Sequence, residues 1–312
     1  MVSFHNEARY LRRCLLSLLD QTYPKDRYEI ILVNDGSQDA SQETISDLLD
    51  AERARVSLLV QSDRGPAAGR NLGVAHAKGA IVAFTDPDCV ADKDWLVQHV
   101  ESYVSNEIGG VEGRVETDWS ELLYPIRVSP AGFRYVTCNM SYRLDALKEV
   151  GSFDEDFRWK EDDELAYRVI EAGWRLVSAT NAVVYHPVKM LSKRALISYG
   201  LKHRYDIPFY RKHPQVAKNY FQLRRLGPLA VTPEFLFSVG SLLAILLAWL
   251  ALSINTFIGF SLIALLAFLA VWQRRRMLKR KAKASLLWMA VFIVLIELGR
   301  IYGSVEFRKF LL

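Results

Sequence analysis

The chain has 312 residues, 51% of them hydrophobic, and a formal net charge of +5, which allows a domain with its own core and a second part besides. Hydrophobic residues concentrate after Pro233, where an ordinary mixed sequence gives way to long apolar runs. Much of the positive charge lies in one short loop between those runs. Anionic lipid headgroups account for that loop, so the charge does not require a nucleic-acid partner.

Strands and helices alternate in the first third of the chain. Three apolar, β-rich runs end in polar turns, at residues 28–37, 55–65 and 79–88. Helical patterns are predicted before and between them, at residues 7–19, 41–49 and 66–77. The last helix is rich in small residues, which suits close packing on a strand. The first strand is reduced to "MVSF", so we expect either a start further upstream or a fold that tolerates a short edge.

This alternation predicts a parallel sheet with helices on its faces. Ligands of such sheets lie beyond the carboxyl ends of the strands. Three successive strand ends carry polar pairs, namely Asn34-Asp35, Asp63-Arg64, and Asp86 with Asp88. We therefore expect these side chains to face one crevice.

The next segment mixes strands and helices. A strand beginning near residue 134 is predicted to lead into a helix that runs from Leu144 to a C-terminal cap at Gly151. A second helix is predicted at residues 160–174, where four successive acids suit a helix N-terminus. Residues 175–187 indicate either a strand pair or a strand–turn–strand unit.

Three apolar runs predict membrane-spanning helices near the C-terminal end. They cover residues 235–254, 257–272 and 286–302. A helix needs about 20 apolar residues to cross a bilayer, so the first run is long enough and the second is slightly short. The third contains Glu297 and Arg300 near its end, and a re-entrant segment is the alternative for it.

The basic loop "RRRMLKRKAK" at residues 274–283 is expected on the cytoplasmic side, which places the preceding soluble part in the cytoplasm. Residues 192–214 mix basic and aromatic side chains, a composition typical of a helix lying on a membrane surface. Dispersed cysteines fit a reducing compartment. The charged N-terminal segment "MVSFHNEARY" predicts no cleavable signal peptide.

Asp86 and Asp88 flank Pro87 directly after an apolar run. Hard carboxylate oxygens suit Mg²⁺ or Mn²⁺, and Mg²⁺ commonly shares its ligands with substrate phosphates. A solvated polar turn is the alternative. His186, which ends the apolar run "AVVYH", is either a further metal ligand or a strand-end histidine.

Two further groups have the same ambiguity. Asp35, in an N-D-G-S turn, suits hydrogen bonding to a base or ribose, but turn formation alone explains it. Arg64 and Arg70, in "DRGPAAGRNLG", either steady a phosphate or belong to a surface loop and a capped helix.

An acid cluster at residues 161–164 offers a general base. Crowded carboxylates raise one another's pKa, and a carboxylate so placed can accept a proton from a hydroxyl. An acidic first helical turn explains the same four residues. The sequence does not distinguish Asp162 from Asp163.

In their order along the chain, these segments resemble the family 2 glycosyltransferases, inverting enzymes of the GT-A type. "VSFHNEARYLRRCLLSLLDQTYP" resembles the opening strand and helix of the family, and "EIILVNDGSQD" resembles its nucleotide-binding turn. "GPAAGRNLGVAHAKGAIVAFTDPDCV" resembles the segment that leads to its DxD motif. "CNMSYRLDALKEVGSFDEDF" and "EDDELAYRVIEAGWRL" are similar to its acceptor side with the E-D base motif. The resemblance covers residues 1 to about 190.

The resemblance implies an α/β GT-A fold, a Rossmann-like, mostly parallel sheet with flanking helices, at residues 1–190. Composition and hydropathy add amphipathic interfacial helices or a linker at residues 191–232 and a C-terminal helical transmembrane region. Residues 233–312 become a transmembrane region of about three helices with a basic cytoplasmic loop at 273–284.

The resemblance also implies roles for individual residues. Asp162 is the expected general base. Asp88 is the expected ligand of Mg²⁺ or Mn²⁺, with His186 and Asp86 as further candidates. The expected nucleotide-sugar contacts are Ser3, Glu7, Asp35, Arg64, Arg70 and Asp86. Processive members carry a Q-x-x-R-W motif, for which this chain has only the distant "QLRRL" at 222–226, so transfer of a single sugar is expected.

The expected function is therefore metal-dependent transfer of one sugar from a UDP-, GDP- or dTDP-sugar to a hydroxyl of a lipid-linked or glycolipid acceptor. The expected location is the cell membrane, with several spans and membrane lipids as partners. Two alternatives stay open: transfer onto a polyprenyl phosphate, and a non-catalytic sugar-nucleotide-binding assembly partner.

Overall fold

The computed structural model describes most of two stretches and several short pieces of the chain. These are residues 1–117, 135–187, 198, 200–216, 224–226, 229–231, 295 and 298–302. The chain divides into two compact units, the first formed by residues 1–118 and 126–188 and the second by residues 119–125 and 189–312.

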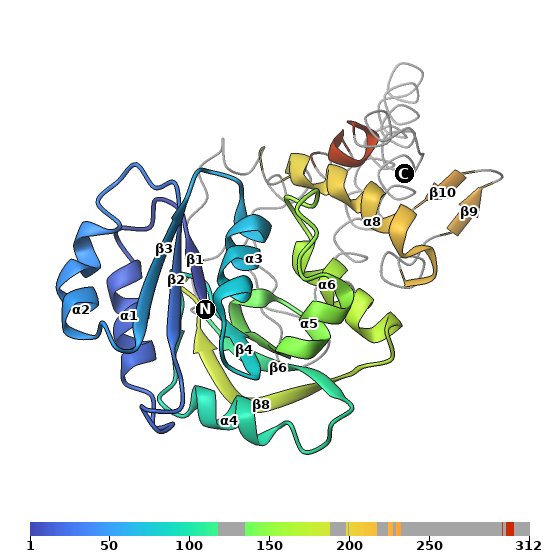
Figure 1. Ribbon diagram of the computed structural model, residues 1–312. Helices are drawn as coiled ribbons and strands as arrows, with labels where there is room; N and C mark the ends of the chain where they lie inside the picture. The colour runs from blue at the N-terminus through green and yellow to red at the C-terminus, as the bar shows by residue number, and fades with distance from the viewer. Residues whose placement is uncertain are drawn as a thin grey trace, which may run out of the picture. The chain divides into compact units, whose positions relative to one another are not determined.

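A three-stranded parallel sheet opens the first unit. Its strands are β1 (Val2–Phe4), β2 (Ile30–Asp35) and β3 (Val56–Gln61), paired in the order β1-β2-β3. Helices α1 (Leu11–Leu19) and α2 (Ser46–Ala51) lie on one side of this sheet and α3 (Pro66–His76) on the other (Figure 1). The predicted strand–helix alternation is thus confirmed. The second predicted helix is shorter than expected, because a 3₁₀ turn at Glu43–Ile45 precedes α2.

A five-stranded mixed sheet completes the unit, in the order β4-β7-β6-β8-β5. Its strands are β4 (Ile81–Phe84), β5 (Val90–Ala91), β6 (Ile108–Glu116), β7 (Met140–Arg143) and β8 (Arg175–Tyr185). The longest strand pair in each sheet is parallel, β2 with β3 in the first sheet and β6 with β8 in the second. The antiparallel pairs β4–β7, β5–β8 and β6–β7 are shorter.

The two sheets adjoin at Met1. Its nitrogen donates to the Ala83 carbonyl at 2.9 Å, and its own carbonyl accepts from the Thr85 N–H at 3.2 Å. The third predicted strand, β4, therefore lies beside β1, although its ladder partner is β7. As a result, the carboxyl ends of β2 and β4 open on the same side of the first unit.

Three further helices cover the mixed sheet: α4 (Trp95–Glu101), α5 (Leu144–Val150) and α6 (Glu161–Glu171). Helix α5 ends as predicted, because Gly151 adopts the left-handed conformation (φ 79°) that suits a helix C-cap. Residues 175–187 contain one strand rather than two: β8 is continuous, with a register shift that absorbs residues 180–182.

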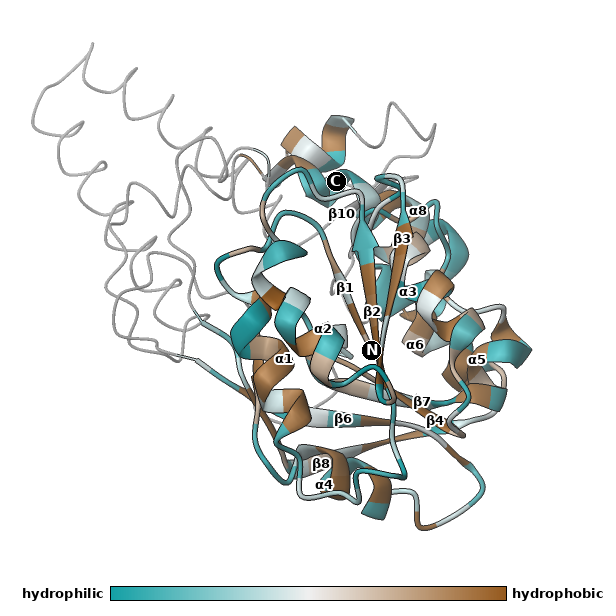
Figure 2. Ribbon diagram, turned by 60° about the vertical axis from the view of Figure 1, so that its left-hand side comes forward, coloured by the Kyte–Doolittle hydropathy of each residue, from teal (hydrophilic) through white to brown (hydrophobic). Residues whose placement is uncertain are grey.

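Hydropathy follows this layering. Strands β2, β3 and β4 are mostly hydrophobic, whereas α1, α2 and α5 carry both hydrophobic and hydrophilic residues (Figure 2). Side chains alternate across a strand, so β1 sends Val2 and Phe4 toward the cluster that contains Leu11, Leu15 and Leu18 of α1.

Helix α3 packs closely on β1, as its small residues predicted. A Cβ atom added at Gly69 would collide with the Ser3 side chain, and one added at Gly73 would collide with Met1. This close approach fixes the height of α3 above the sheet, and several candidate site residues lie on α3 or next to it.

A buried polar network joins α4 to the mixed sheet through His99, which has no exposed surface. Its Nε2 lies 2.9 Å from Asn139 Oδ1, and its Nδ1 lies 2.9 Å from Ser141 Oγ. The Trp95 indole N–H also donates to Asn139 Oδ1, at 2.7 Å. Burial lowers the pKa of His99 to about 4, although the Asn139 contact opposes the shift. The ring is therefore neutral in the folded protein at neutral pH.

We expect the stability of this unit to fall as the pH decreases from about 6.5 to about 4. In that window the unfolded chain protonates His99 and the folded chain does not, so protons favour unfolding. The full shift corresponds to at most about 3 kcal/mol. Urea unfolding at pH 7 and pH 5, compared with the same pair for His99→Gln, measures it. An equal loss of stability in the variant would contradict the prediction.

The described part of the second unit contains a 3₁₀ turn at Lys202–Tyr205, helix α8 (Asp206–Lys212) and the antiparallel pair β9 (Arg224–Leu226) and β10 (Leu229–Val231). Asp206 is fully buried, and it accepts from Arg300 Nε at 2.9 Å. Arg300, an ionised residue within the third apolar run, is thus charge-compensated.

No helix among the described residues is both long and apolar enough to cross a membrane. The apolar runs at 235–254 and 257–272 and the basic loop at 273–284 lie outside the described residues. Most of the run at 286–302 does so too. The transmembrane prediction is therefore carried by the sequence alone.

Candidate functional site

Acidic side chains gather at the carboxyl ends of β2 and β4. Asp35 is the last residue of β2, and Asp86 and Asp88 follow β4 in a tight turn. The Cys89 N–H donates to the Asp86 carbonyl at 3.0 Å, which closes a turn with Pro87 at its second position, where proline is favoured. The backbone thereby directs Asp88 and Cys89 toward β8.

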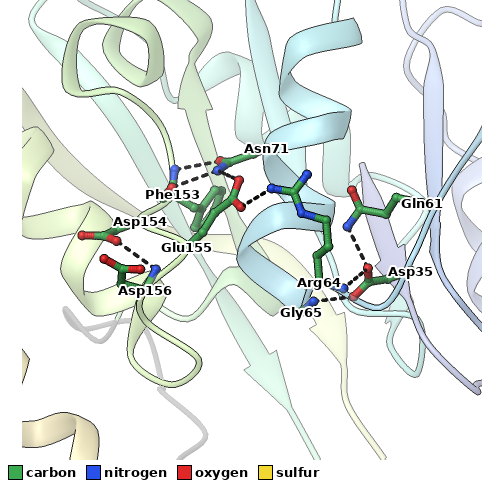
Figure 3. A network of polar contacts seen from close by, with 9 residues as sticks. All are labelled: Asp35, Gln61, Arg64, Gly65, Asn71, Phe153, Asp154, Glu155 and Asp156. Atoms are coloured by element: carbon green, nitrogen blue, oxygen red, sulfur yellow. Dashed lines mark hydrogen bonds and ion pairs between the residues drawn. The ribbon is translucent and has the colours of Figure 1, made fainter.

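Asp35 is buried and anchors the loop between β3 and α3 (Figure 3). Its Oδ1 accepts from Gln61 Nε2 at 2.7 Å and from the Arg64 backbone N–H at 2.9 Å. Its Oδ2 accepts from the Gly65 N–H at 2.8 Å. Gly65 precedes α3 with φ 95°, a conformation that glycine adopts readily. The carboxylate thus holds the start of α3, and its predicted contact with a base stays a prediction.

One helical turn further along α3, Arg70 joins two acidic segments. Its NH1 lies 2.8 Å from Glu161 Oε1 at the start of α6, and its NH2 lies 3.4 Å from Asp86 Oδ1. Burial alone would lower the pKa of Arg70, but the Glu161 and Asp86 carboxylates raise it above its usual value. A permanently charged guanidinium therefore ties the turn after β4 to the start of α6.

Asn71 provides a second connection, between α3 and the loop that contains Phe153. Its side-chain amide donates to the Phe153 carbonyl at 2.9 Å, and its side-chain oxygen accepts from the Phe153 N–H at the same distance (Figure 3). Glu155, in the same loop, pairs with Arg64 at 2.7 Å. These contacts fix the chain that leads into α6.

Asp86 faces several charged groups at once. Burial raises its pKa, Arg70 opposes that rise, and Asp88 adds to it. The Asp86 side chain is still 33% exposed, so it remains open to a ligand on one side. Its predicted role toward the sugar nucleotide is untested.

Asp88 and His186 form the part of the site best suited to a divalent ion. His186 Nε2 lies 3.7 Å from Asp88 Oδ1, and Asp88 is 9% exposed. Two ligands about 2.1 Å from one ion are roughly 3.0–3.4 Å apart, so a small movement accommodates it. His186 Nδ1 lies 2.9 Å from the Pro187 carbonyl, which can only accept a hydrogen bond. In the neutral ring, Nε2 therefore carries the lone pair that faces Asp88.

The four acids at the start of α6 have different interaction partners. Lys160 adopts a left-handed conformation (φ 67°) immediately before the helix. Glu161 pairs with Arg70 at 2.8 Å, Asp163 with Lys160 at 3.3 Å, and Glu164 with Arg168 at 2.7 Å.

Asp162 forms no ion pair with any residue that the structure describes. Its Oδ1 accepts from the backbone N–H of Asp163 at 2.9 Å. Burial raises the pKa of Asp162 well above its usual value, and the neighbouring Glu161 and Asp163 raise it further. Geometry thus distinguishes Asp162 from Asp163, which the sequence could not do.

The structure brings Asp86, Asp88, Arg70 and His186 together, and Asp162 interacts electrostatically with Arg70. Asp86 interacts electrostatically with Arg70, Asp88 and His186, and Arg70 with Asp162.

For the other predicted nucleotide-sugar contacts, Ser3, Glu7 and Arg64, the structure shows contacts within the protein, and their role toward the donor stays a prediction. The Ser3 side chain lies against Gly69 of α3. The backbone N–H of Glu7, in the turn before α1, donates to the Ser41 hydroxyl oxygen at 2.8 Å. The guanidinium of Arg64 pairs with Glu155 rather than with the group around Asp88.

Two residues of the site were missed by the sequence argument. Glu161 was grouped with its neighbours, and only the folded structure pairs it with Arg70. Cys89 was treated only as one of three dispersed thiols, yet its Sγ lies 3.8 Å from Asp88 Oδ1. Its position directly after the second acid of the D-P-D turn was the available signal.

Comparisons with known proteins show which family this chain is similar to. Residues 1–149 match the family model described as glycosyl transferase family 2. Glycosyltransferase AglE of Haloferax volcanii is 29% identical over 64% of this chain and 71% of its own length. The dolichyl N-acetyl-α-D-glucosaminyl phosphate 3-β-D-2,3-diacetamido-2,3-dideoxy-β-D-glucuronosyltransferase of Methanococcus voltae is 24% identical over 76% of this chain and 78% of its own. The chain spans only 34% and 41% of two further curated relatives.

Among solved structures, the fold is similar to the mannosyltransferase PcManGT from Pyrobaculum calidifontis, solved with GDP-Man and Mn²⁺. The TM-score is 0.65 at 17% identity, over 97% of this chain and 86% of that one. This likeness shows the GT-A-like α/β fold.

Proposed function

We propose, from the premise that this chain is a glycosyltransferase with a family 2 domain at residues 1–149, that it transfers one sugar from a nucleotide-sugar donor to a hydroxyl of a lipid-linked acceptor. The main support is that Asp162 interacts electrostatically with the same Arg70 that contacts Asp86, and that it is the acid in the first turn of α6 that forms no ion pair with a described residue. In this proposal, Arg70 would hold the proton acceptor close to the donor-binding turn.

Asp88 and His186 would hold Mg²⁺ or Mn²⁺, which when bound supplies positive charge to the leaving diphosphate. Support comes from their 3.7 Å separation and from the Mn²⁺ in the solved relative. Asp86 and the loop anchored by Asp35 would bind the nucleoside part of the donor. Arg70 would keep the donor turn and α6 in register.

Asp162 would accept the proton of the acceptor hydroxyl as the oxygen attacks the anomeric carbon. The attack comes from the face opposite the leaving nucleotide, so a single displacement inverts the configuration. Holding donor and acceptor in line supplies much of the acceleration. The raised pKa of Asp162 brings its basicity closer to that needed for proton transfer near neutral pH.

A lipid-linked acceptor is proposed on two grounds. The Methanococcus voltae relative is named for a dolichyl phosphate-linked sugar. The apolar runs at 235–254, 257–272 and 286–302 would also anchor the chain in a membrane, with the catalytic domain in the cytoplasm and an acceptor presented at the lipid surface. Resistance of the full chain to alkaline extraction from membranes tests the anchoring, and complete release would contradict it.

A panel of UDP-, GDP- and dTDP-sugars with Mn²⁺ tests the donor part of the proposal, with released nucleotide as the measurement. We expect turnover of one nucleotide class and none in the presence of a chelator. Absence of turnover with every donor would contradict the enzymatic proposal and favour a binding partner instead. For the acceptor part, a chain lacking residues 191–312 should hydrolyse donor but lose transfer to a lipid-borne acceptor.

A further inference from the structure

The turn after β4 carries a thiol whose position the proposed reaction does not use. Cys89 directly follows Asp88 and is 1% exposed. The ligand atoms of Asp88, Cys89 and His186 all lie within 4.8 Å of one another. Within this set, Asp88 Oδ1 is 3.8 Å from Cys89 Sγ and 3.7 Å from His186 Nε2.

Strand pairing next to the site brings the segments of Cys89 and His186 together. Strands β5 and β8 are antiparallel, with Val90 opposite Tyr185 and Ala91 opposite Val184. Cys89 directly precedes β5 and His186 directly follows β8, so continuing the same register would place them opposite each other, where Cβ atoms are about 4.5–5.5 Å apart. That placement agrees with the ligand atoms of both residues lying within 4.8 Å of each other and of the Asp88 carboxylate.

One thiol, one imidazole and one carboxylate are a donor set that differs from the preferences of Mg²⁺ and Mn²⁺. Those hard cations favour oxygen ligands, whereas Zn²⁺ takes cysteine sulfur, histidine nitrogen and carboxylate oxygen. Tetrahedral zinc with bond lengths of about 2.0–2.3 Å puts its donor atoms roughly 3.3–3.6 Å apart. The Asp88–Cys89 and Asp88–His186 separations, 3.8 and 3.7 Å, exceed that range by only one or two tenths of an ångström, and the Cys89 and His186 ligand atoms lie within 4.8 Å of each other.

We propose that Asp88, Cys89 and His186 can together bind Zn²⁺ and similar borderline-soft cations, with the Cys89 thiolate as a ligand. Zn²⁺ bound in this way inhibits the enzyme, because it occupies Asp88 and His186 in place of Mg²⁺ or Mn²⁺. The inhibitory part rests on the proposed function. Binding exchanges the thiol proton for the metal, so one S–Zn bond forms and one proton is released to solvent. Mg²⁺ and Mn²⁺ leave the thiol protonated and bind the nitrogen and oxygen donors only.

Co²⁺ is the probe, because a thiolate–cobalt bond gives a near-ultraviolet charge-transfer band that oxygen and nitrogen ligands do not give. The full chain, kept reduced, is titrated with Co²⁺. We expect the band to saturate near one equivalent and to disappear when Zn²⁺ is added. A wild-type protein without the band overturns the proposal, whatever the variants do.

Cys89→Ser is expected to abolish the band, and Cys89→Ala serves as a second variant in case the serine perturbs the buried site. Cys14→Ser is the matched control, since Cys14 is equally buried but lies outside the three-residue set. The control should keep the band. A band that persists in both Cys89 variants assigns the thiolate to another cysteine and overturns the proposal.

Zn²⁺ inhibition of Mn²⁺-dependent donor turnover supplies the second readout. Because even outer contacts of metal ligands change affinity by about 10–100-fold, loss of the direct sulfur ligand should raise the inhibitory Zn²⁺ concentration by at least about tenfold. An unchanged inhibitory concentration in Cys89→Ser contradicts the inhibitory mode. A Cys89-dependent band in a protein without donor turnover would instead leave the site standing and refute the proposed function.

Discussion

Replacing Asp162 with Asn is expected to lower sugar transfer to a hydroxyl acceptor by about 10²–10⁴-fold, the usual contribution of a general base. The amide cannot accept the hydroxyl proton, but it has nearly the shape of the carboxylate and can keep the hydrogen bond from the Asp163 N–H. Donor affinity should change little. Initial rates of transfer and the Kd of the donor nucleotide, measured separately, test both statements.

Asp163→Asn is the matched control for this experiment. Asp163 is the next residue of α6 and is itself buried, but its carboxylate is paired with Lys160. Its loss should lower stability, because a buried lysine then loses a partner, and should leave the rate at low temperature within about tenfold. If Asp163→Asn instead has the larger effect on transfer, the assignment of the base moves by one residue.

The pH dependence of wild-type transfer follows from the same carboxylate. Burial and the neighbouring acids raise the pKa of Asp162 well above its usual value, and only the deprotonated form accepts a proton. Transfer should therefore decline toward acid through a pKa that lies clearly above about 3.9, the value of an unperturbed aspartate. The acid limb of kcat/KM against pH should vanish in the residual activity of Asp162→Asn.

Substantial retention of transfer by Asp162→Asn would favour the other enzymatic alternative, in which the acceptor is a polyprenyl phosphate. A phosphate oxygen is already ionised at neutral pH and needs little help from a base. A direct comparison of a polyprenyl phosphate with a hydroxyl acceptor, in wild type and variant, separates the two reactions.

Asp88→Ala is expected to reduce metal-dependent donor turnover by about 10³-fold or more. A divalent ion stabilises the developing charge by several kcal/mol, and each 1.36 kcal/mol is about a factor of ten in rate. Asp88 Oδ1 lies 3.7 Å from His186 Nε2, so the loss of its carboxylate removes the oxygen donor of the pair. Turnover as a function of Mn²⁺ concentration, together with Mn²⁺ binding followed by electron paramagnetic resonance, measures both consequences.

Asp92→Ala is the control for this change. Asp92 lies four residues further along the chain and is exposed, and its carboxylate accepts from the Asp94 N–H at 3.0 Å. We expect its metal affinity and turnover to match the wild type within about twofold, because exposed substitutions rarely cost more than about 0.5 kcal/mol. Equal Mn²⁺ affinity in Asp88→Ala and wild type would show that the ion is bound elsewhere.

The order of elements in the first unit could be predicted from local pattern. Apolar runs, polar turns with glycine, and the small residues of α3 are all properties of short segments. They predicted β2, β3, β4 and α3 and placed Asp35, Asp86 and Asp88 at strand ends. Local pattern was less informative at residues 175–187, where a register shift keeps β8 continuous.

By itself, the sequence determined which acids follow which strands, where the chain becomes apolar, and which family the motifs resemble. These are one-dimensional properties, fixed by residue type and spacing. Only the tertiary structure decided which charged groups pair with one another. Arg70 forms ion pairs with Glu161 and Asp86, and Lys160 forms one with Asp163, which distinguishes Asp162 from its neighbours. The tertiary structure also decided that Cys89 lies near His186, because the pairing of β5 with β8 joins segments almost a hundred positions apart. Ion pairing and metal coordination depend on distances between side chains in space. The order of four successive acids along the chain does not determine those distances.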